Sequence, residues 1–104
     1  MNTLEISLIQ STINHGRLYF ARTDQDFFPL DCFGDRKKSG YKGDTIIFSG
    51  AGLSFETFVR VLSGTRISPQ RSFAPYLRSV AAKPGGVLRV TRCSARLYSL
   101  EYLG

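Results

Sequence analysis

The sequence predicts a mainly β protein, a small open β-barrel of about seven short strands with two short helices. Short segments in which apolar and polar residues alternate recur along the chain, and turn-forming residues separate them. Many short strands at regular spacing favour a sheet that closes or nearly closes on itself, because closure leaves few strand edges exposed. The length of 104 residues, 42% of them hydrophobic, suits a single domain over residues 1–104 with one core.

The first elements are expected to form a β-hairpin. Leu4, Ile6 and Leu8 alternate with more polar neighbours, as in a half-buried strand, and a second strand is expected over residues 17–22. Residues 11–16 between them are turn-forming types, so we expect them at the tip of the hairpin.

A short helical element is expected over residues 27–34. Pro29 suits a first helical position, and Gly34 suits a C-terminal stop. Residues 35–43, which follow, are basic and glycine-rich and are expected to form a polar loop.

The rest of the chain follows from the same rules. Ser72 suits the N-terminal cap of a helix over residues 73–80, in which Phe73, Leu77 and Val80 have core-facing spacing. The other expected elements are a strand over 44–49, a turn over 50–52, a strand over 53–62, a polar segment over 63–71, a type II turn over 83–86, and strands over 87–91 and 97–102.

The net charge of +6 is unevenly distributed along the chain. Residues 1–52 carry equal numbers of basic and acidic residues, whereas residues 53–104 carry eight basic residues, seven of them Arg, against two acidic ones. Arg offers a planar fork of donors that suits phosphates and guanine edges. One interpretation is a polyanion-binding surface formed mainly by the second half, and the other is a solvated basic face without a partner.

Several classes of protein are not expected. No apolar run approaches the roughly 20 residues of a membrane span, and the first residues lack the layout of a signal peptide. Cys32 and Cys93 are expected to be two buried free thiols in a reducing compartment, which is the cytoplasm in a bacterium or the nucleus in a eukaryote. We expect neither a membrane nor a secreted protein.

The chain offers little for catalysis. His15 is the only histidine, and Asp24 and Asp26 are the closest acidic pair. No Ser-His-Asp arrangement, HExxH motif or P-loop is present, and two Cys with one His are too few at these spacings to bind a metal. We expect no enzyme activity, no metal and no cofactor. The alternative is a small metal-dependent nuclease that uses Asp24 and Asp26.

The aromatic residues have two interpretations, as core or as stacking platforms for a single-stranded nucleic acid. Their positions on alternating strand patterns favour the core for Phe27, Phe28, Tyr19, Phe20, Phe48 and Phe55. Phe58 is the exception, because it lies on the face opposite Phe55 and next to Arg60.

Two polar segments stand out as candidate binding residues. Their Asn, Gln and Arg side chains suit base edges, and their Ser, Thr and Gly residues let a backbone approach phosphates closely. The candidates in the first segment are Ser11, Thr12, Asn14, His15 and Arg17, and those in and around the second are Arg60, Ser63, Thr65, Arg66, Ser68, Gln70 and Arg71. The alternative is that both are ordinary hairpin turns.

The order of these features over about residues 4–102 resembles the B3-type DNA-binding pseudobarrel, a family of plant transcription-factor domains and effector domains of bacterial restriction endonucleases. The resemblance consists of patterns without a signature motif. It rests on the recognition-arm-like segments 11–16 and 63–71, the proline-then-helix element at 27–33, the strands at 45–48 and 56–59, Ser72-Phe73 at the start of the second helix, and the turn and strand at 83–88. Phe73 replaces the family's usual Trp, Gly86 replaces its usual Asp, and the loop at 34–43 is basic.

The resemblance implies sequence-specific binding of double-stranded DNA by two arms in the major groove, without chemistry by the domain itself. It implies that Asn14, His15, Arg66 and Gln70 approach bases. Phosphates would be held by Arg17, Ser63, Thr65, Arg60 and Arg71, with Lys37 and Lys38 extending the contact. The chain would then be a stand-alone regulator, or the targeting domain of a restriction enzyme whose nuclease lies elsewhere, and would act as a monomer or weak dimer.

Two further alternatives stay open beside the nuclease. One is a protein-interaction barrel whose basic half binds an acidic protein. The other is a module that binds RNA or single strands through Phe58 and neighbouring Tyr residues.

Overall fold

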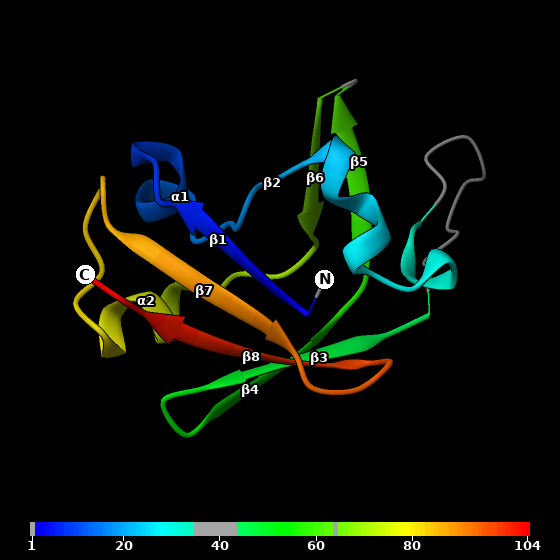
Figure 1. The fold of residues 1–104 in the computed structure, drawn as a ribbon. Coiled ribbons are helices and arrows are strands. Elements are labelled where there is room, and N and C mark those ends of the chain that lie inside the picture. The colour runs from blue at the N-terminus through cyan, green and yellow to red at the C-terminus, as the bar shows by residue number, and fades with distance from the viewer. Residues whose placement is uncertain (1, 35–43, 64) are drawn as a thin grey trace.

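The computed structural model describes residues 2–34, 44–63 and 65–104, which form two β-sheets around one core. In sheet order, the five-stranded sheet consists of β1 (Thr3–Ser7), β7 (Val87–Arg92), β8 (Leu97–Tyr102), β3 (Ile46–Gly50) and β4 (Leu53–Thr57). The three-stranded sheet consists of β2 (Phe20–Ala21), β6 (Arg66–Pro69) and β5 (Val59–Ser63) (Figure 1). The sheets do not close into a barrel, so the mainly β, open fold is confirmed.

The helical elements are short. Two α-helices, α1 (Gln10–His15) and α2 (Ala74–Ser79), and two 3-10 helices, η1 (Arg22–Phe27) and η2 (Leu30–Cys32), occur in the described residues. None of these helices is long and apolar enough to cross a membrane.

The expected hairpin of the first two strands is wrong. β1 pairs with β7 and β2 pairs with β6, so the two strands belong to different sheets. Residues 10–15 form α1 in place of a turn, and Gly16 ends this helix in the left-handed conformation (φ 67°), where its N–H donates to the Thr12 carbonyl at 2.8 Å. The helix turns the chain away from β1, and β1 gains Leu88 and Val90 of β7 as apolar partners.

The expected fourth strand over 53–62 is divided between the sheets. β4 pairs with β3 through a two-residue turn in which Ala51 and Gly52 both have positive φ, as a type I′ turn requires. After Phe58 the chain enters the other sheet, where β5 pairs with β6. The burial pattern continues unbroken through this corner, so the sequence shows one strand where the structure has two, and the described residues form eight strands.

The expected helix over 27–34 is wrong in its bounds, because η1 ends at Phe27 and only the three residues of η2 are helical after it. Phe28 lies between them with extended backbone (φ −112°, ψ 151°), because the residue before a proline is sterically excluded from the helical region. Pro29 precedes η2, and the N–H of Gly34 donates to the Val59 carbonyl at 2.8 Å, so Gly34 lies against β5 and does not end a helix.

The second helix is confirmed, but its expected cap is wrong. The N-cap of α2 is Phe73 and not Ser72, although Ser72 Oγ accepts a hydrogen bond from the Ala74 N–H at 3.3 Å. Phe73 and Leu77 are buried and Val80 is half-buried, as their spacing predicts. The turn over 83–86 has Gly85 at φ 87°, as a type II turn requires, and β7 and β8 follow as expected.

The core lies between the inner faces of the two sheets and is rich in aromatic rings. Phe28 contacts Phe20, Phe27 and Tyr98 with ring centroids 5.1–5.2 Å apart. Phe48 and Phe55 are also buried, so the core interpretation is confirmed for five of the aromatic residues and Tyr19 is half-buried.

The two cysteines differ. Cys32 is buried, and burial raises the pKa of its thiol to about 12. Cys93 is exposed in the turn between β7 and β8, so the expectation that both are buried is wrong. A turn that connects two strands lies at the surface, because its backbone groups need water as a partner.

Candidate nucleic-acid interface

The outer side of the three-stranded sheet carries five of the candidate binding residues. In the register of β5 and β6, Val61 lies opposite Ile67 and Arg60 lies opposite Ser68. Residues opposite each other share a face, so the buried Ile67 marks the inner face, and Arg60 and Ser68 lie on the outer face. We call this outer surface the arginine face; it comprises Arg17, Tyr19, Phe58, Arg60, Arg66 and Gln70. Ser68 lies on the same side of the sheet but is buried.

Arg17 and Tyr19 of the arginine face lie in the segment that directly precedes β2. Leu18 and Phe20 are buried, and Arg17 and Tyr19 alternate with them and are half-buried. The Ser68 hydroxyl donates to the Leu18 carbonyl at 2.6 Å, which ties this segment to β6. The hydrogen bond thereby holds residues 17–19 against the sheet, although only Phe20 and Ala21 of this segment pair regularly with β6.

Two arginines of this face lie over aromatic rings. The guanidinium carbon of Arg60 is 5.6 Å from the centre of the Phe58 ring, and that of Arg66 is 5.4 Å from the centre of the Tyr19 ring. Each contact restricts a long side chain before any ligand arrives, so less conformational entropy is lost on binding.

Two guanidinium groups of this face have donors that the described residues do not satisfy. Arg17 Nη1 and Arg60 Nε are buried and have no hydrogen-bond partner in the described part of the chain. A buried donor without a partner destabilises the folded protein, and a bound anion would relieve that cost.

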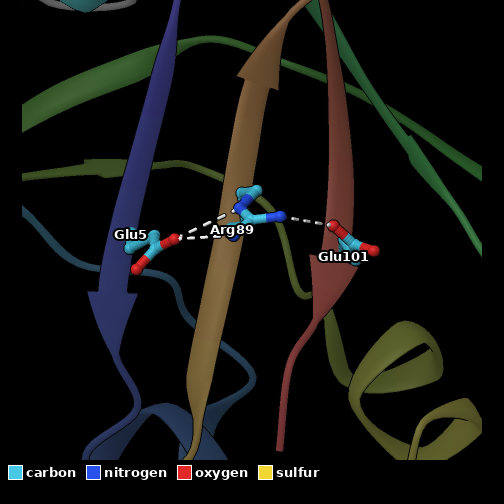
Figure 2. A network of polar contacts seen from close by, with 3 residues as sticks. All are labelled: Glu5, Arg89 and Glu101. Atoms are coloured by element: carbon cyan, nitrogen blue, oxygen red, sulfur yellow. Dashed lines mark hydrogen bonds and ion pairs between the residues drawn. The ribbon is translucent and has the colours of Figure 1, made fainter.

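The ion pairs of the described residues involve other arginines, Arg89 and Arg96. On the outer face of the five-stranded sheet, Arg89 lies between Glu5 and Glu101, with N–O distances of 3.0 and 3.3 Å (Figure 2). Among the described residues, no carboxylate lies within ion-pair distance of Arg17, Arg60 or Arg66. Three arginines without a carboxylate partner among the described residues therefore share one sheet face, and one of them, Arg17, lies in the half of the chain whose charges the sequence balances.

The two polar segments predicted as arms lie at opposite ends of the segment that contains β2. Figure 1 shows α1 at the upper left and the β5–β6 hairpin at the top, with β2 between them. Asn14 and His15 are exposed at the end of α1, and Gln10 Nε2 donates to Asn14 Oδ1 at 2.9 Å. The first arm is a helix and not the expected hairpin tip.

A hollow of about 350 Å³ lies between Ile9, the residue before α1, and the start of β6. Its lining comes from the end of β1, from the segment around β2 and from the start of β6. The lining residues are Ser7, Ile9, Tyr19, Phe20, Ala21, Thr65 and Arg66.

The candidate residues differ in accessibility. Thr12 and Ser68 are buried, so neither hydroxyl is presented at the surface. Asn14, His15, Thr65, Arg66 and Arg71 are exposed, and Ser11, Arg17, Arg60 and Gln70 are half-buried. Lys37 and Lys38 and the side chain of Ser63 lie outside the described residues.

Arg71 lies apart from the arginine face. Its Nη1 donates to the Glu56 carbonyl at 3.1 Å, and its guanidinium carbon is 5.7 Å from the centre of the Phe55 ring. It therefore lies beside β4, at the edge of the five-stranded sheet.

Sequence reasoning did not assign Tyr19 and Ile9 to the site. The alternation of Arg17 and Tyr19 with Leu18 and Phe20 is a signal that could have found Tyr19. Nothing comparable exists for Ile9, which reaches the hollow because it is the residue before α1.

The acidic pair considered for catalysis lies in a different place. Asp24 and Asp26 line a separate hollow of about 160 Å³ with Leu4, Thr23 and Phe27. Within the described residues, no group of three or more His, Cys, Asp or Glu side chains is arranged to hold a metal ion.

The chain matches no protein-family model, no curated protein and no solved structure. The resemblance to the B3-type pseudobarrel therefore stays a prediction from the sequence pattern.

Proposed function

We propose that this chain binds double-stranded DNA through the arginine face and the two arms, and that it does no chemistry itself. The observation that carries this proposal is the set of three arginines on one outer face, Arg17, Arg60 and Arg66, without carboxylate partners among the described residues. Such a surface attracts phosphates and releases their counterions.

The chemistry of the face favours duplex DNA over an acidic protein. Guanidinium groups bind phosphates and guanine edges with paired hydrogen bonds, and Asn14 and His15 on the other arm add donors and acceptors for base edges. An acidic protein would need no such mixture of groups on two projecting segments.

Duplex is also favoured over single strands. Phe58 and Tyr19 are the aromatic rings of the arginine face, and Arg60 and Arg66 lie over them. A guanidinium group thus occupies a ring face on which an unpaired base would stack.

The test is selection from a randomised duplex pool at moderate salt, followed by sequencing and by fluorescence anisotropy with the enriched duplex. We expect an enriched motif, and we expect Arg60→Gln and Arg66→Gln each to weaken binding by about 1–3 kcal/mol. Arg89→Gln is the matched control, because Arg89 lies on the outer face of the five-stranded sheet, away from this face and from α1, and carries the same charge.

Three results would overturn the proposal. The first is no measurable binding of duplex, and the second is an equal loss of affinity in Arg89→Gln. The third is tighter binding of a single strand than of the duplex, which would favour the stacking alternative. Metal-dependent cleavage of the bound DNA, lost in Asp24→Asn with Asp26→Asn, would contradict the absence of chemistry.

The wider role follows from this proposal. A domain that recognises DNA without cutting it serves as a regulator or as the targeting part of a restriction-type enzyme. Selection with and without a candidate nuclease subunit distinguishes these two roles.

A further inference from the structure

The 350 Å³ hollow beside the start of β6 combines an apolar wall with a cation. Ile9 and Ala21 are exposed apolar residues in its lining, and Arg66 lies over the Tyr19 ring in the same hollow. A site for phosphate alone needs no apolar wall, so this part of the surface is suited to something other than the DNA backbone.

Ile9 is held in place by the start of α1. Its carbonyl accepts hydrogen bonds from the N–H groups of Thr12 at 3.0 Å and Ile13 at 3.3 Å, and its side chain is 38% exposed. An exposed isoleucine on a braced backbone presents methyl groups at a defined position, and such a surface favours another methyl group as its partner.

The apolar group that a base edge presents in the major groove is the 5-methyl group of a pyrimidine. Thymine carries it, and 5-methylcytosine presents the same group at the same position. Apolar side chains contact this methyl group, and an arginine beside them pairs with O6 and N7 of guanine.

We propose that the hollow binds the 5-methyl group of a pyrimidine that stands next to a guanine, with Ile9 and Ala21 against the methyl group and Arg66 on the guanine. This inference rests on the proposed binding of duplex DNA and names the base feature that is recognised. Thymine and 5-methylcytosine share the chemistry, and the experiment below separates them.

The base stays in its stack in this proposal. An extruded base is held between two stacking surfaces, and Tyr19 is the accessible ring in the hollow, since Phe20 is buried. Arg66 already lies over the Tyr19 ring, so the hollow is suited to the edge of a paired base.

The test uses the duplex enriched in the selection above and the full chain. Each thymine is replaced in turn by uracil, which removes only the methyl group, and each cytosine by 5-methylcytosine, which adds it. We expect one position beside a guanine at which the methyl group strengthens binding about fourfold, as burial of one methyl group predicts.

The matched variants are Ile9→Ala and Leu97→Ala. Leu97 is also 38% exposed but lies on β8, away from the hollow. Ile9→Ala is expected to bind the two forms of the duplex equally, whereas Leu97→Ala keeps the fourfold difference. Thermal melting shows that both variants are folded.

Each outcome decides between the proposals. If uracil in place of thymine weakens binding, the site is assigned to thymine. If uracil has no effect but 5-methylcytosine in place of cytosine strengthens binding, the site is assigned to 5-methylcytosine. Duplex binding with neither effect, or with an effect that persists in Ile9→Ala, overturns this inference and leaves the proposed function standing. No duplex binding at all overturns both.

Discussion

At the scale of single residues, Arg60 shows a conflict between stability and binding. Its Nε is buried without a hydrogen-bond partner in the described part of the chain, while its guanidinium group lies over Phe58. Functional sites commonly retain such costly groups, because the ligand supplies the missing partner. The same argument applies to Arg17, whose Nη1 is also buried and unpaired among the described residues.

Replacing Arg60 by Met should therefore stabilise the protein and weaken DNA binding. The substitution keeps the length of the side chain and removes the unsatisfied donor, so we expect the free energy of unfolding to rise by about 1 kcal/mol. Chemical denaturation measures the first effect and anisotropy the second. Arg66→Met is the control that should weaken binding without stabilising, because Arg66 is exposed. A loss of stability in Arg60→Met would contradict this explanation.

Two buried residues predict how stability depends on alkaline pH. Burial raises the pKa of Cys32 from its ordinary value of 9.0, and that of Tyr98 from 10.0, in both cases to about 12. The unfolded chain loses these protons first, so the folded state is fully favoured below about pH 9 and loses stability as pH rises towards about 12. In chemical denaturation at a series of pH values, Cys32→Ala should reduce this fall. Cys93→Ala, which changes an exposed thiol, should leave it unchanged.

At the scale of elements, the position of the first arm depends on Gly16. A Cβ atom at Gly16 would lie 2.6 Å from Ser72 Oγ and 3.1 Å from the Ala74 backbone nitrogen. The Gly16 carbonyl also accepts the Phe73 N–H at 2.6 Å, so the end of α1 packs directly against the start of α2. The arm is thus braced by a close approach of two backbones.

Gly16→Ala should destabilise the protein more than Gly52→Ala. Both glycines have positive φ, which costs an alanine about 1 kcal/mol, but a Cβ atom at Gly52 meets nothing within 4 Å. The clash at Gly16 adds to this strain, so we expect a total loss of about 2–3 kcal/mol there. Thermal melting of the two variants measures the difference. Equal losses would show that the contact with α2 is not important.

The elements also show which parts of the fold the sequence could predict. The period of two identified most strands, since it reports which face of a strand is buried and needs no knowledge of the partner. It could not show that β1 pairs with β7, because many apolar strands offer equivalent partners. α1 was missed because a helix of six residues depends on its contact with α2 more than on its own sequence.

The sequence predicted many of the residues of the candidate site, but not the elements that carry them or their burial. Asn14, His15 and Arg66 lie on the two arms, since exposed polar residues at the ends of elements are visible in the sequence. Thr12 and Ser68 are of the same residue types, but contacts with distant segments bury them. The division of charge between the sheets was invisible, because ion pairs such as Arg89–Glu5 join residues far apart along the chain.

At the scale of the whole molecule, the two outer sheet faces differ in charge. Arg17, Arg60 and Arg66 lie on the three-stranded sheet, whereas the five-stranded sheet carries the Glu5–Arg89–Glu101 network. A polyanion is attracted to the first face and repelled by the second, so the molecule is oriented as it approaches DNA.

The salt dependence of binding should report this orientation. Each phosphate contact that is removed lowers the slope of log affinity against log salt by about 0.9, so we expect Arg17→Gln to lower it by about that amount. Arg89→Gln, which removes the same charge from the other sheet, should leave the slope unchanged. Anisotropy titrations at a series of salt concentrations measure both slopes. Equal changes in the two variants would show that net charge alone attracts the DNA.

The place of β8 in the larger sheet has a consequence for synthesis of the chain. β8 lies between β7 and β3, so it joins the β1–β7 pair to the β3–β4 hairpin. On a ribosome, β1 emerges before β7 and β8, and its sheet is completed only when residues 97–102 have emerged. Non-local pairing of this kind makes folding slow. A nascent chain stalled before β8 would expose two unfinished sheet edges, and keeping it soluble until β8 emerges becomes a task for chaperones.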